Sequence, residues 1–381
     1  MRQCLIFLLL ILLQLSGCKF TKDKAPLTLL VGTYTDSPEQ GISVYRFDEN
    51  TLDYTLLSTA PVVNPSFLTL SSDNKWVYAI SAQDSINAKV ISFRFDISTA
   101  SLMPVNSKST YGGYPCHINN DDTRIYIANY GSGSLCYYHK SSDGSIGQLI
   151  DVIDFNDPAN NIANNAVNVQ AGATSGIPAA HAHCVYFSPD SSQVFVNNLG
   201  HDRIHCFDRS NDPSVLRLTP GKQSSLSVAP GNGPRHSVFS KDGSKMYLIN
   251  EISGKVDVFD YKDQILSMVQ SVACDSVGGH GSADIHISHD GRFLYASNRL
   301  KADGLSVFNV NDNGLLTKVG YQKTGIHPRN FILTPNDKYI LVACRDNDQI
   351  EIYSRNSKTG LLKDTGKLIK LHKPVCLKWA Y

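Results

Sequence analysis

Several side chains suited to proton transfer and anion binding interrupt otherwise apolar segments of the sequence. His181 and His183 stand in AAHAHCVYF, and Arg235 and His236 follow the loop PGNG. Glu251 comes directly after the run MYLIN. A carboxylate or an imidazole can move a proton, and a guanidinium can hold a carboxylate or phosphate through two parallel hydrogen bonds. These residue types therefore indicate a site that binds an anion and transfers a proton.

Among the charged residues that lie within or directly after apolar segments, arginines outnumber acids. Arg299 follows the apolar run FLYASN, Arg329 lies in HPRNF, and Arg345 follows ILVAC. Because a buried charge without a partner is costly, these arginines must either pair with an acid or receive a bound anion. A ring of ion pairs that only fills a channel, with Glu251 against Arg235 or Arg299, is the structural alternative. The excess of arginine favours a functional pocket.

A metal is a further possibility for the histidines. His181 and His183 are two residues apart, so both side chains can lie on one face of a strand. No third ligating residue follows at a spacing typical of a metal-binding motif. We therefore expect neither a metal nor another cofactor. The glycines of the loop 230–234 can also offer backbone amides to an anion, but Gly-rich turns are frequent in this chain.

Repeated segments must position these residues. GPRHSVFSKDGSKMYLINEISGKVDVFD, from Gly233, matches AHCVYFSPDSSQVFVNNLGHDRIHCFD, from Ala182, and further copies begin at Ser282 and His327. Each contains an apolar strand, a tight turn, a second strand, a polar loop and a third strand. Equivalent positions recur after 50, 67, 52, 48, 46 and 46 residues, at Pro65, Pro115, Ala182, Pro234, Ser282, Pro328 and Pro374. Periods near 50 with only strands are typical of propeller blades.

The two ends of the chain complete each other. The last copy has room for one strand, LKWAY, whereas LTLLVGTYT and GISVYRFD near the amino end lack a first strand. We therefore predict an all-β, seven-bladed β-propeller over residues 27–381, with four-stranded blades and with N- and C-terminal strands closing the ring in one blade. No helical period persists, so helices should be minor. The 67-residue step contains an insertion at roughly 156–180.

The phase of the repeat predicts which side chains meet. The first strand of a blade lies nearest the axis, so its start and the end of the second strand share one mouth of the channel. The start position is occupied by Ser66, Cys116, His183, Arg235, Ala283, Arg329 and Val375. The next position is occupied by Phe67, His117, Cys184, His236, Asp284, Asn330 and Cys376. The position after the second strand is occupied by Ala82, Tyr130, Leu199, Glu251, Arg299 and Arg345.

The first residues precede this fold. Arg2 and the apolar run Leu5–Leu13 are typical of a signal peptide and too short to span a bilayer with margin. LSGC, ending at Cys18, resembles a bacterial lipobox, which predicts a signal peptide over 1–17, acylation of Cys18 and a tether over 18–26. An ordinary signal peptide with an incidental cysteine is the alternative. We expect a lipid-anchored protein of the cell envelope, on the periplasmic side or at the cell surface.

Charge and cysteine content limit the partners. The formal net charge of +1 over 381 residues gives no attraction to nucleic acid. Seven cysteines remain beyond Cys18, an odd number without a C-x-x-C motif. We therefore expect buried free thiols rather than a disulfide framework or a zinc ribbon. We expect the protein to be a monomer.

The motifs together resemble a known family. GNGPRH, FSKDG and YLINE, with VGTYT, HAH, SNR and HPRNF in order, are similar to the lactonase family of seven-bladed propellers, which includes 6-phosphogluconolactonases and 3-carboxymuconate cyclases. The resemblance covers essentially the whole chain after the signal peptide. It implies that His183, Arg235, His236, Glu251 and Arg299 occupy the active site.

A lactone hydrolase acting on a sugar-acid lactone is the function that this resemblance implies. Glu251 is our choice of general base and His183 the alternative, while Arg235 and Arg299 would hold the carboxylate or phosphate and stabilise the oxyanion. His236 would protonate the leaving alkoxide or brace Glu251. We also expect substrate contacts from Arg329, Arg345, His117 and His181.

Two other functions remain open at this stage. The same groups can run the reverse reaction, as in the cyclases. A surface propeller that binds carbohydrate or protein without catalysis belongs to a different class, and fold alone does not separate the two.

Overall fold

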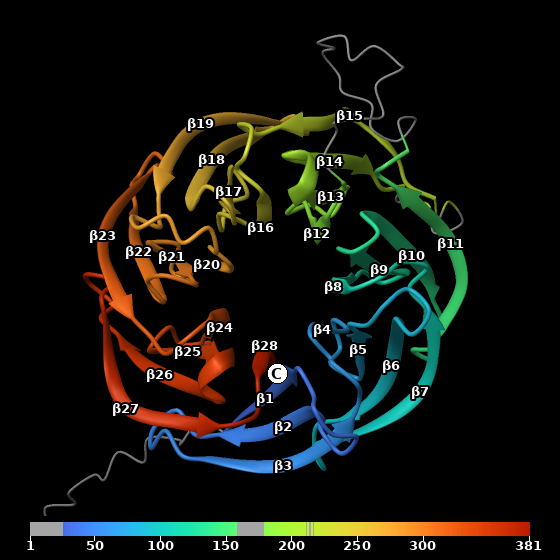
Figure 1. The fold of residues 1–381 in the computed structure, drawn as a ribbon, viewed down its shortest axis with the longest axis horizontal. Coiled ribbons are helices and arrows are strands. Elements are labelled where there is room, and N and C mark those ends of the chain that lie inside the picture. The colour runs from blue at the N-terminus through green and yellow to red at the C-terminus, as the bar shows by residue number, and fades with distance from the viewer. Residues whose placement is uncertain (1–25, 158–178, 211, 213–214, 216) are drawn as a thin grey trace, which may run out of the picture.

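Seven four-stranded antiparallel sheets form a closed ring around a central axis (Figure 1). The computed structural model describes residues 26–157, 179–210, 212, 215 and 217–381. Within these residues, helix is limited to the 3₁₀ helices η2 (Leu199–His201) and η3 (Arg345–Asn347). The predicted all-β, seven-bladed propeller with minor helices is confirmed. The signal peptide, Cys18, nearly all of the tether and most of the 156–180 insertion lie outside the described residues.

Six blades follow chain order from the axis outward. The first three comprise β4 (Leu68–Leu70), β5 (Trp76–Ser81), β6 (Lys89–Asp96) and β7 (Ser101–Ser109); β8 (Pro115–Asn120), β9 (Arg124–Asn129), β10 (Ser134–Lys140) and β11 (Ile146–Asp154); and β12 (Ala182–Phe187), β13 (Gln193–Asn198), β14 (Arg203–Asp208) and β15 (Thr219–Ser227). The next three comprise β16 (Pro234–Phe239), β17 (Lys245–Asn250), β18 (Lys255–Lys262) and β19 (Ile265–Ala273); β20 (Ile285–Ile287), β21 (Phe293–Asn298), β22 (Gly304–Val310) and β23 (Leu316–Lys323); and β24 (Pro328–Leu333), β25 (Tyr339–Cys344), β26 (Gln349–Arg355) and β27 (Leu362–Lys370).

The seventh blade joins the two ends of the chain. β28 (Pro374–Ala380) lies innermost and pairs with β1 (Leu27–Thr33), which is followed by β2 (Gly41–Phe47) and β3 (Tyr54–Pro61). The register places Thr28 opposite Ala380 and Val31 opposite Leu377. This pairing satisfies backbone groups that would otherwise form two open edges, and it confirms the predicted closure.

Apolar clusters between neighbouring blades form the core. Central strands such as β9 and β13 are buried over their whole length, because a blade is covered on both faces by its neighbours. Val194 and Val196 of β13, for example, belong to one cluster with Leu135 and Tyr137 of β10. Outermost strands such as β7 are mostly exposed. The ring thereby fixes the inner strands around the axis.

A left-handed residue followed by proline begins several inner strands. Asn64, Tyr114, His327 and Lys373 each have positive φ, between 38° and 63°, and each precedes a proline of the repeat. Proline tolerates the first position of a strand because its missing N–H is not needed there. These turns set the rim of the channel mouth.

Two inner strands are shorter than predicted. Regular pairing begins at Leu68 in β4 and at Ile285 in β20, so Ser66, Phe67 and Asp284 precede the assigned strands. The chain nevertheless stays close to the second strand, because the Ser297 amide donates to the Asp284 carbonyl at 2.9 Å.

All seven cysteines of the described chain are free thiols, and Cys116 alone among them is not fully buried. This confirms the expectation of buried free thiols. No helix among the described residues is long and apolar enough to cross a membrane.

Candidate functional site

β-bulges aim the key side chains into the channel mouth. The pairing of the first and second strands shifts by one residue between Pro115 and His117 in β8 and between Ala182 and Cys184 in β12. Equivalent shifts occur in β16 and β24. The extra residues are Cys116, His183, Arg235 and Arg329. A bulge re-aims a side chain next to a functional site, and here it lets two successive residues of one strand face the axis.

Three of the four bulged residues, Cys116, His183 and Arg329, border a cavity of about 460 Å³. Its walls also come from turns and loops at the ends of the inner and second strands. The lining residues are Tyr34, Asn64, Ala82, Tyr114, Pro115, Cys116, Tyr130, His183, Glu251 and Arg329. Of the catalytic residues that the sequence predicts, His183 and Glu251 line this cavity, and of the predicted substrate-binding residues Arg329 does.

Two arginines clamp the Glu251 carboxylate. Arg235 Nε donates to Glu251 Oε2 at 2.7 Å, and Arg299 Nη2 lies 3.1 Å from Oε1. The side chains of both arginines are almost fully buried, at 2% and 4% exposure, whereas that of Glu251 is 25% exposed. Burial raises the pKa of Glu251, but the charges of Arg235, Arg299 and Arg329 outweigh it and hold that pKa below its ordinary value.

Other donors of the two arginines contact neighbouring groups. Arg299 Nε donates to the Gly281 carbonyl at 2.7 Å, and its Nη1 lies 3.1 Å from His327 Nε2. Arg235 Nη1 donates to the Ala283 carbonyl at 2.6 Å. The ion-pair alternative raised by the sequence is therefore correct for Glu251, and Arg299 positions the carboxylate rather than facing the cavity.

Arg329 is the uncompensated cation of the mouth. Within the described part of the chain its guanidinium has neither an ion-pair nor a hydrogen-bond partner, and its closest assigned contact is the Tyr34 ring, with Cζ 5.8 Å from the ring centroid. With Arg235 and Arg299 sharing Glu251, this cluster carries three guanidiniums for one carboxylate. The excess charge predicted from the sequence is present, and it is located on Arg329.

His183 is a buried, neutral imidazole at the cavity wall. Its Nδ1 is enclosed and has no hydrogen-bond partner among the described residues. Burial, followed by the charge of Arg235, holds the pKa of His183 well below its ordinary value. The ring is therefore uncharged at neutral pH and has a lone pair that can accept a proton.

His236 lies behind the clamp. Its Nδ1 donates to Asp284 Oδ1 at 2.8 Å, and its Nε2 faces Arg235 Nη1 at 3.4 Å. Burial, with the charge of Arg235, lowers the pKa of His236 to about 4 despite Asp284. The ring contacts Arg235 rather than Glu251 and does not line the cavity, so the geometry favours bracing over donation to a leaving group.

Three predicted substrate contacts lie outside the cavity wall. His181 stacks on Tyr130 at 4.4 Å between ring centroids, and its Nδ1 hydrogen-bonds to the Tyr130 carbonyl at 2.8 Å. Arg345 forms a two-point ion pair with Asp346. His117 packs on Phe67 below the mouth, with ring centroids 4.2 Å apart. These side chains support the site or the fold around it.

The glycine loop binds an anion of its own chain. The amides of Gly231 and Gly233 each donate to the Asp202 carboxylate at 2.7 Å. Asn232 Nδ2 donates to Asp257 at 3.0 Å. These two amides are therefore engaged in holding the loop in place.

Sequence reasoning missed part of the rim. Tyr34, Asn64 and Tyr114 line the cavity but lie in loops outside the regular strands. The residue before each repeat proline is a signal that would have identified Asn64 and Tyr114.

The fold and the site define a seven-bladed β-propeller with a cationic pocket at one mouth of its channel. The family model of the "Lactonase, 7-bladed beta-propeller" matches residues 28–379. The chain belongs to this lactonase family.

Its relatives include enzymes named for lactones. The chain is 34% identical over 346 residues to a 6-phosphogluconolactonase of Formosa agariphila, covering 88% of this chain and 94% of that protein. A proposed 6-phosphogluconolactonase of Bacteroides fragilis has a solved structure with a TM-score of 0.86 and 44% identity, covering 95% of this chain and 99% of that one. The periplasmic gluconolactonase of Pseudomonas aeruginosa aligns with a TM-score of 0.83 and 28% identity, over 94% and 99% of the two chains.

Proposed function

We propose that this protein hydrolyses the lactone of a sugar acid in the cavity at the channel mouth. The observation that carries the proposal is the presence in one cavity of a free guanidinium, Arg329, and a neutral imidazole, His183. Lactone hydrolysis needs a base for the attacking water and a cation for the oxyanion that forms at the carbonyl. The cavity offers both.

Arg329 binds the reacting carbonyl. Its guanidinium stabilises the oxyanion of the tetrahedral intermediate and then holds the product carboxylate, for which planar two-point contacts suit arginine. The tyrosines of the rim, among them Tyr34 and Tyr130, give the sugar ring apolar faces and hydroxyl groups to contact.

His183 moves the proton. It accepts a proton from water as the water oxygen bonds to the carbonyl carbon, and it returns that proton to the ring oxygen when the carbon–oxygen bond breaks. Glu251 is the weaker candidate for this step, since both of its oxygens hold guanidiniums. The geometry thus favours His183, the alternative base, over Glu251.

Glu251 and its two arginines fix the electrostatics of the cavity. The carboxylate stabilises the imidazolium that His183 becomes, and the buried arginines keep the carboxylate ionised and in place. The names of the relatives support lactones of gluconic acid, with or without a phosphate, as the substrate class.

A panel of lactones tests this function. Acid release from glucono-1,5-lactone, its 6-phosphate and other aldonolactones is followed at constant pH, with spontaneous hydrolysis subtracted. We expect catalysed hydrolysis that is lost in His183→Asn and kept in His181→Asn, whose ring stacks on Tyr130 outside the cavity wall. No turnover of any lactone above background would overturn the proposal in favour of a non-catalytic binding propeller.

We also propose that the enzyme acts in the cell envelope, attached through lipid on Cys18. The lipobox-like LSGC motif supports this location. Cys18→Ser should abolish incorporation of labelled fatty acid into the protein. Incorporation that persists in the variant would contradict acylation of Cys18.

A further inference from the structure

Three side chains of metal-ligating type meet inside the channel, next to the cavity. His117 of β8, Cys184 of β12 and His236 of β16 occupy the same position in three consecutive blades, one residue after the bulge. Their ligand atoms all lie within 4.8 Å of one another, and all three residues are buried. Ligands bound at about 2.0–2.3 Å to a tetrahedral ion are about 3.3–3.8 Å apart. Side-chain shifts of about 1 Å therefore bring the three atoms to coordination distance.

His236 has the outer contacts typical of a metal ligand. Its Nδ1 donates to Asp284 at 2.8 Å, and Asp284 is itself held by His286 Nε2 at 3.0 Å and by the Phe331 amide at 3.3 Å. A carboxylate on one ring nitrogen orients the other toward an ion. The described contact at that other nitrogen, Nε2, is a long one from Arg235.

His117 and Cys184 complete the set. The His117 ring centroid lies 5.5 Å from that of His236, and its Nδ1 has a long contact, 3.4 Å, with the Val185 amide. The Cys184 thiol is buried and forms no disulfide, and the Ser237 backbone amide donates to its sulfur.

The surrounding charges can balance a dication. A Cys184 thiolate and the buried Asp284 carboxylate supply two negative charges. The nearest guanidinium, Arg235, is already paired with Glu251. The charge of Lys378, whose Nζ lies 4.8 Å from the Phe67 ring centroid, acts on His117 and opposes binding.

We propose that His117, Cys184 and His236 bind one thiophilic divalent ion of the Zn²⁺ class. Two imidazoles and a thiolate form a donor set typical of zinc, with a fourth position left for water. On binding, the Cys184 S–H bond is replaced by a sulfur–metal bond and the proton leaves to solvent, with no change of oxidation state. The site adjoins the proposed lactone chemistry, since the His236 ring centroid lies 5.2 Å from that of His183. The test of ion binding does not use lactone hydrolysis, so either proposal can fail without the other.

Cobalt provides a probe that does not depend on activity. The full chain is treated with a chelator, dialysed, and titrated with Co²⁺ and then with Zn²⁺. We expect one ion per chain, a near-ultraviolet thiolate-to-cobalt charge-transfer band, and loss of the band when Zn²⁺ displaces Co²⁺. Absence of stoichiometric binding in the wild type would overturn the proposal.

Two cysteine variants assign the band. Cys184→Ser should abolish it, whereas Cys376→Ser, which removes a buried thiol at the equivalent position of the closing blade, should leave it unchanged. A band that survives in Cys184→Ser, or disappears equally in Cys376→Ser, contradicts the assignment. If Cys184→Ser does not fold by circular dichroism, His117→Gln provides the same test. Asp284→Asn should weaken Zn²⁺ affinity about 10–100-fold.

Discussion

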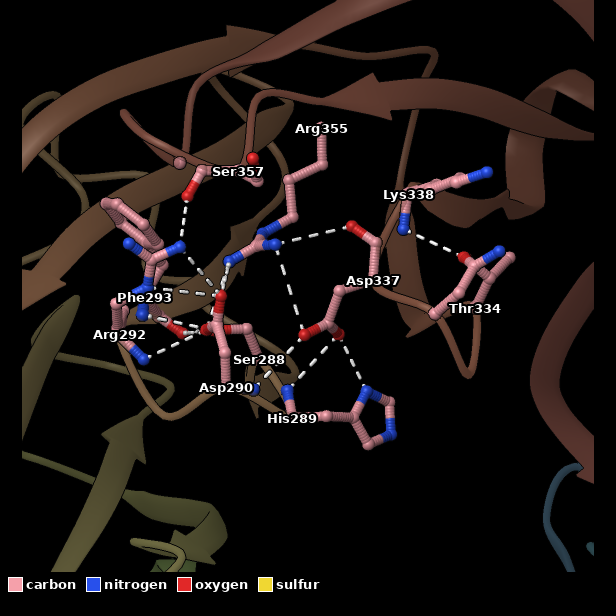
Figure 2. A network of polar contacts seen from close by, with 12 residues as sticks. Ser288, His289, Asp290, Arg292, Phe293, Thr334, Asp337, Lys338, Arg355 and Ser357 are labelled. Carbon is pink, nitrogen blue, oxygen red and sulfur yellow. Dashed lines mark hydrogen bonds and ion pairs between the residues drawn. The ribbon is translucent and has the colours of Figure 1, made fainter.

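Charged side chains gather at both faces of the ring, but they are arranged differently at each. On the face opposite the cavity, Arg355 at the end of β26 joins turns of two neighbouring blades (Figure 2). Its Nε donates to the Tyr295 hydroxyl at 2.8 Å, and its Nη2 lies 3.1 Å from Asp290 Oδ2. Asp337 in turn accepts from His289 Nδ1 at 2.6 Å. Each charge in this network has a partner.

The carboxylates of that face also belong to a repeated turn. A Ser or Thr hydroxyl donates to an Asp or Asn two residues later, between the first and second strands of five blades. The pairs are Ser71–Asp73, Ser188–Asp190, Ser240–Asp242, Ser288–Asp290 and Thr334–Asn336. Repetition of the same turn in five blades indicates a structural role.

The channel mouth has neither complete charge pairing nor repetition of the same residues between blades. Its bulge residues differ from blade to blade, Arg329 has no acidic partner within the described chain, and His183 Nδ1 is enclosed without a hydrogen bond. Buried charge that is matched and repeated stabilises a fold, whereas unmatched charge at a position that varies between blades indicates a site for a ligand. This contrast separates stability from function in one molecule.

The largest effect should follow removal of the unmatched cation. Arg329→Met should lower kcat/KM for the best lactone about 10²–10³-fold, because one oxyanion donor is lost. Arg345→Met is the matched control, since this arginine pairs with Asp346 outside the cavity wall, and it should retain most of the activity. Equal losses in both variants would remove the distinction between the two arginines.

Loss of an arginine on the face opposite the cavity should lower the stability of the fold rather than the activity. Arg355→Met should lower the free energy of unfolding by about 3 kcal/mol, because Asp337 loses its arginine and Asp290 keeps only the exposed Arg292. This remaining ion pair and the partial access of Asp290 to water keep the cost at the lower end for a broken buried pair. Denaturant unfolding measures this loss, while kcat below the unfolding transition should stay within twofold of the wild type. A large fall in kcat with unchanged stability would reverse the comparison.

The smallest expected effect is the change of kcat/KM with pH. An ordinary histidine base, with a pKa of about 6.5, would lower kcat/KM about fourfold between pH 7.5 and pH 6. Since the pKa of His183 is held well below that value, the ring stays neutral and kcat/KM should change less than twofold over this range. The pH profile of the wild type, corrected for spontaneous lactone opening, measures this. A fourfold fall would show that His183 titrates normally or that another base acts.

The ring was predictable because its signals are local and repeated. A 46–52-residue period and the incomplete terminal copies determine seven blades and their closure, and repeat phase placed His183, Glu251 and Arg329 at one mouth. The sequence named Arg235 or Arg299 as the partner of Glu251 but did not predict that both clamp its carboxylate, because the bulge that aims Arg235 has no signal in the strand pattern.

The His117–Cys184–His236 group was not predicted as a metal site, for a related reason. Its members come from three blades, so they have no motif spacing along the chain, although they share one position of the repeat. The repeat phase places the three residues at one position, but it does not give the distances between their ligand atoms, which depend on how the blades pack.

A structure with the product bound tests the central claim most directly. Crystals soaked with gluconate or its 6-phosphate should show the carboxylate within hydrogen-bond distance of the Arg329 guanidinium, with His183 beside the hydroxyl that formed the ring ester. The Glu251 clamp should be unchanged. A ligand bound elsewhere on the ring, with Arg329 making no contact to it, would contradict the assignment of the channel mouth as the active site.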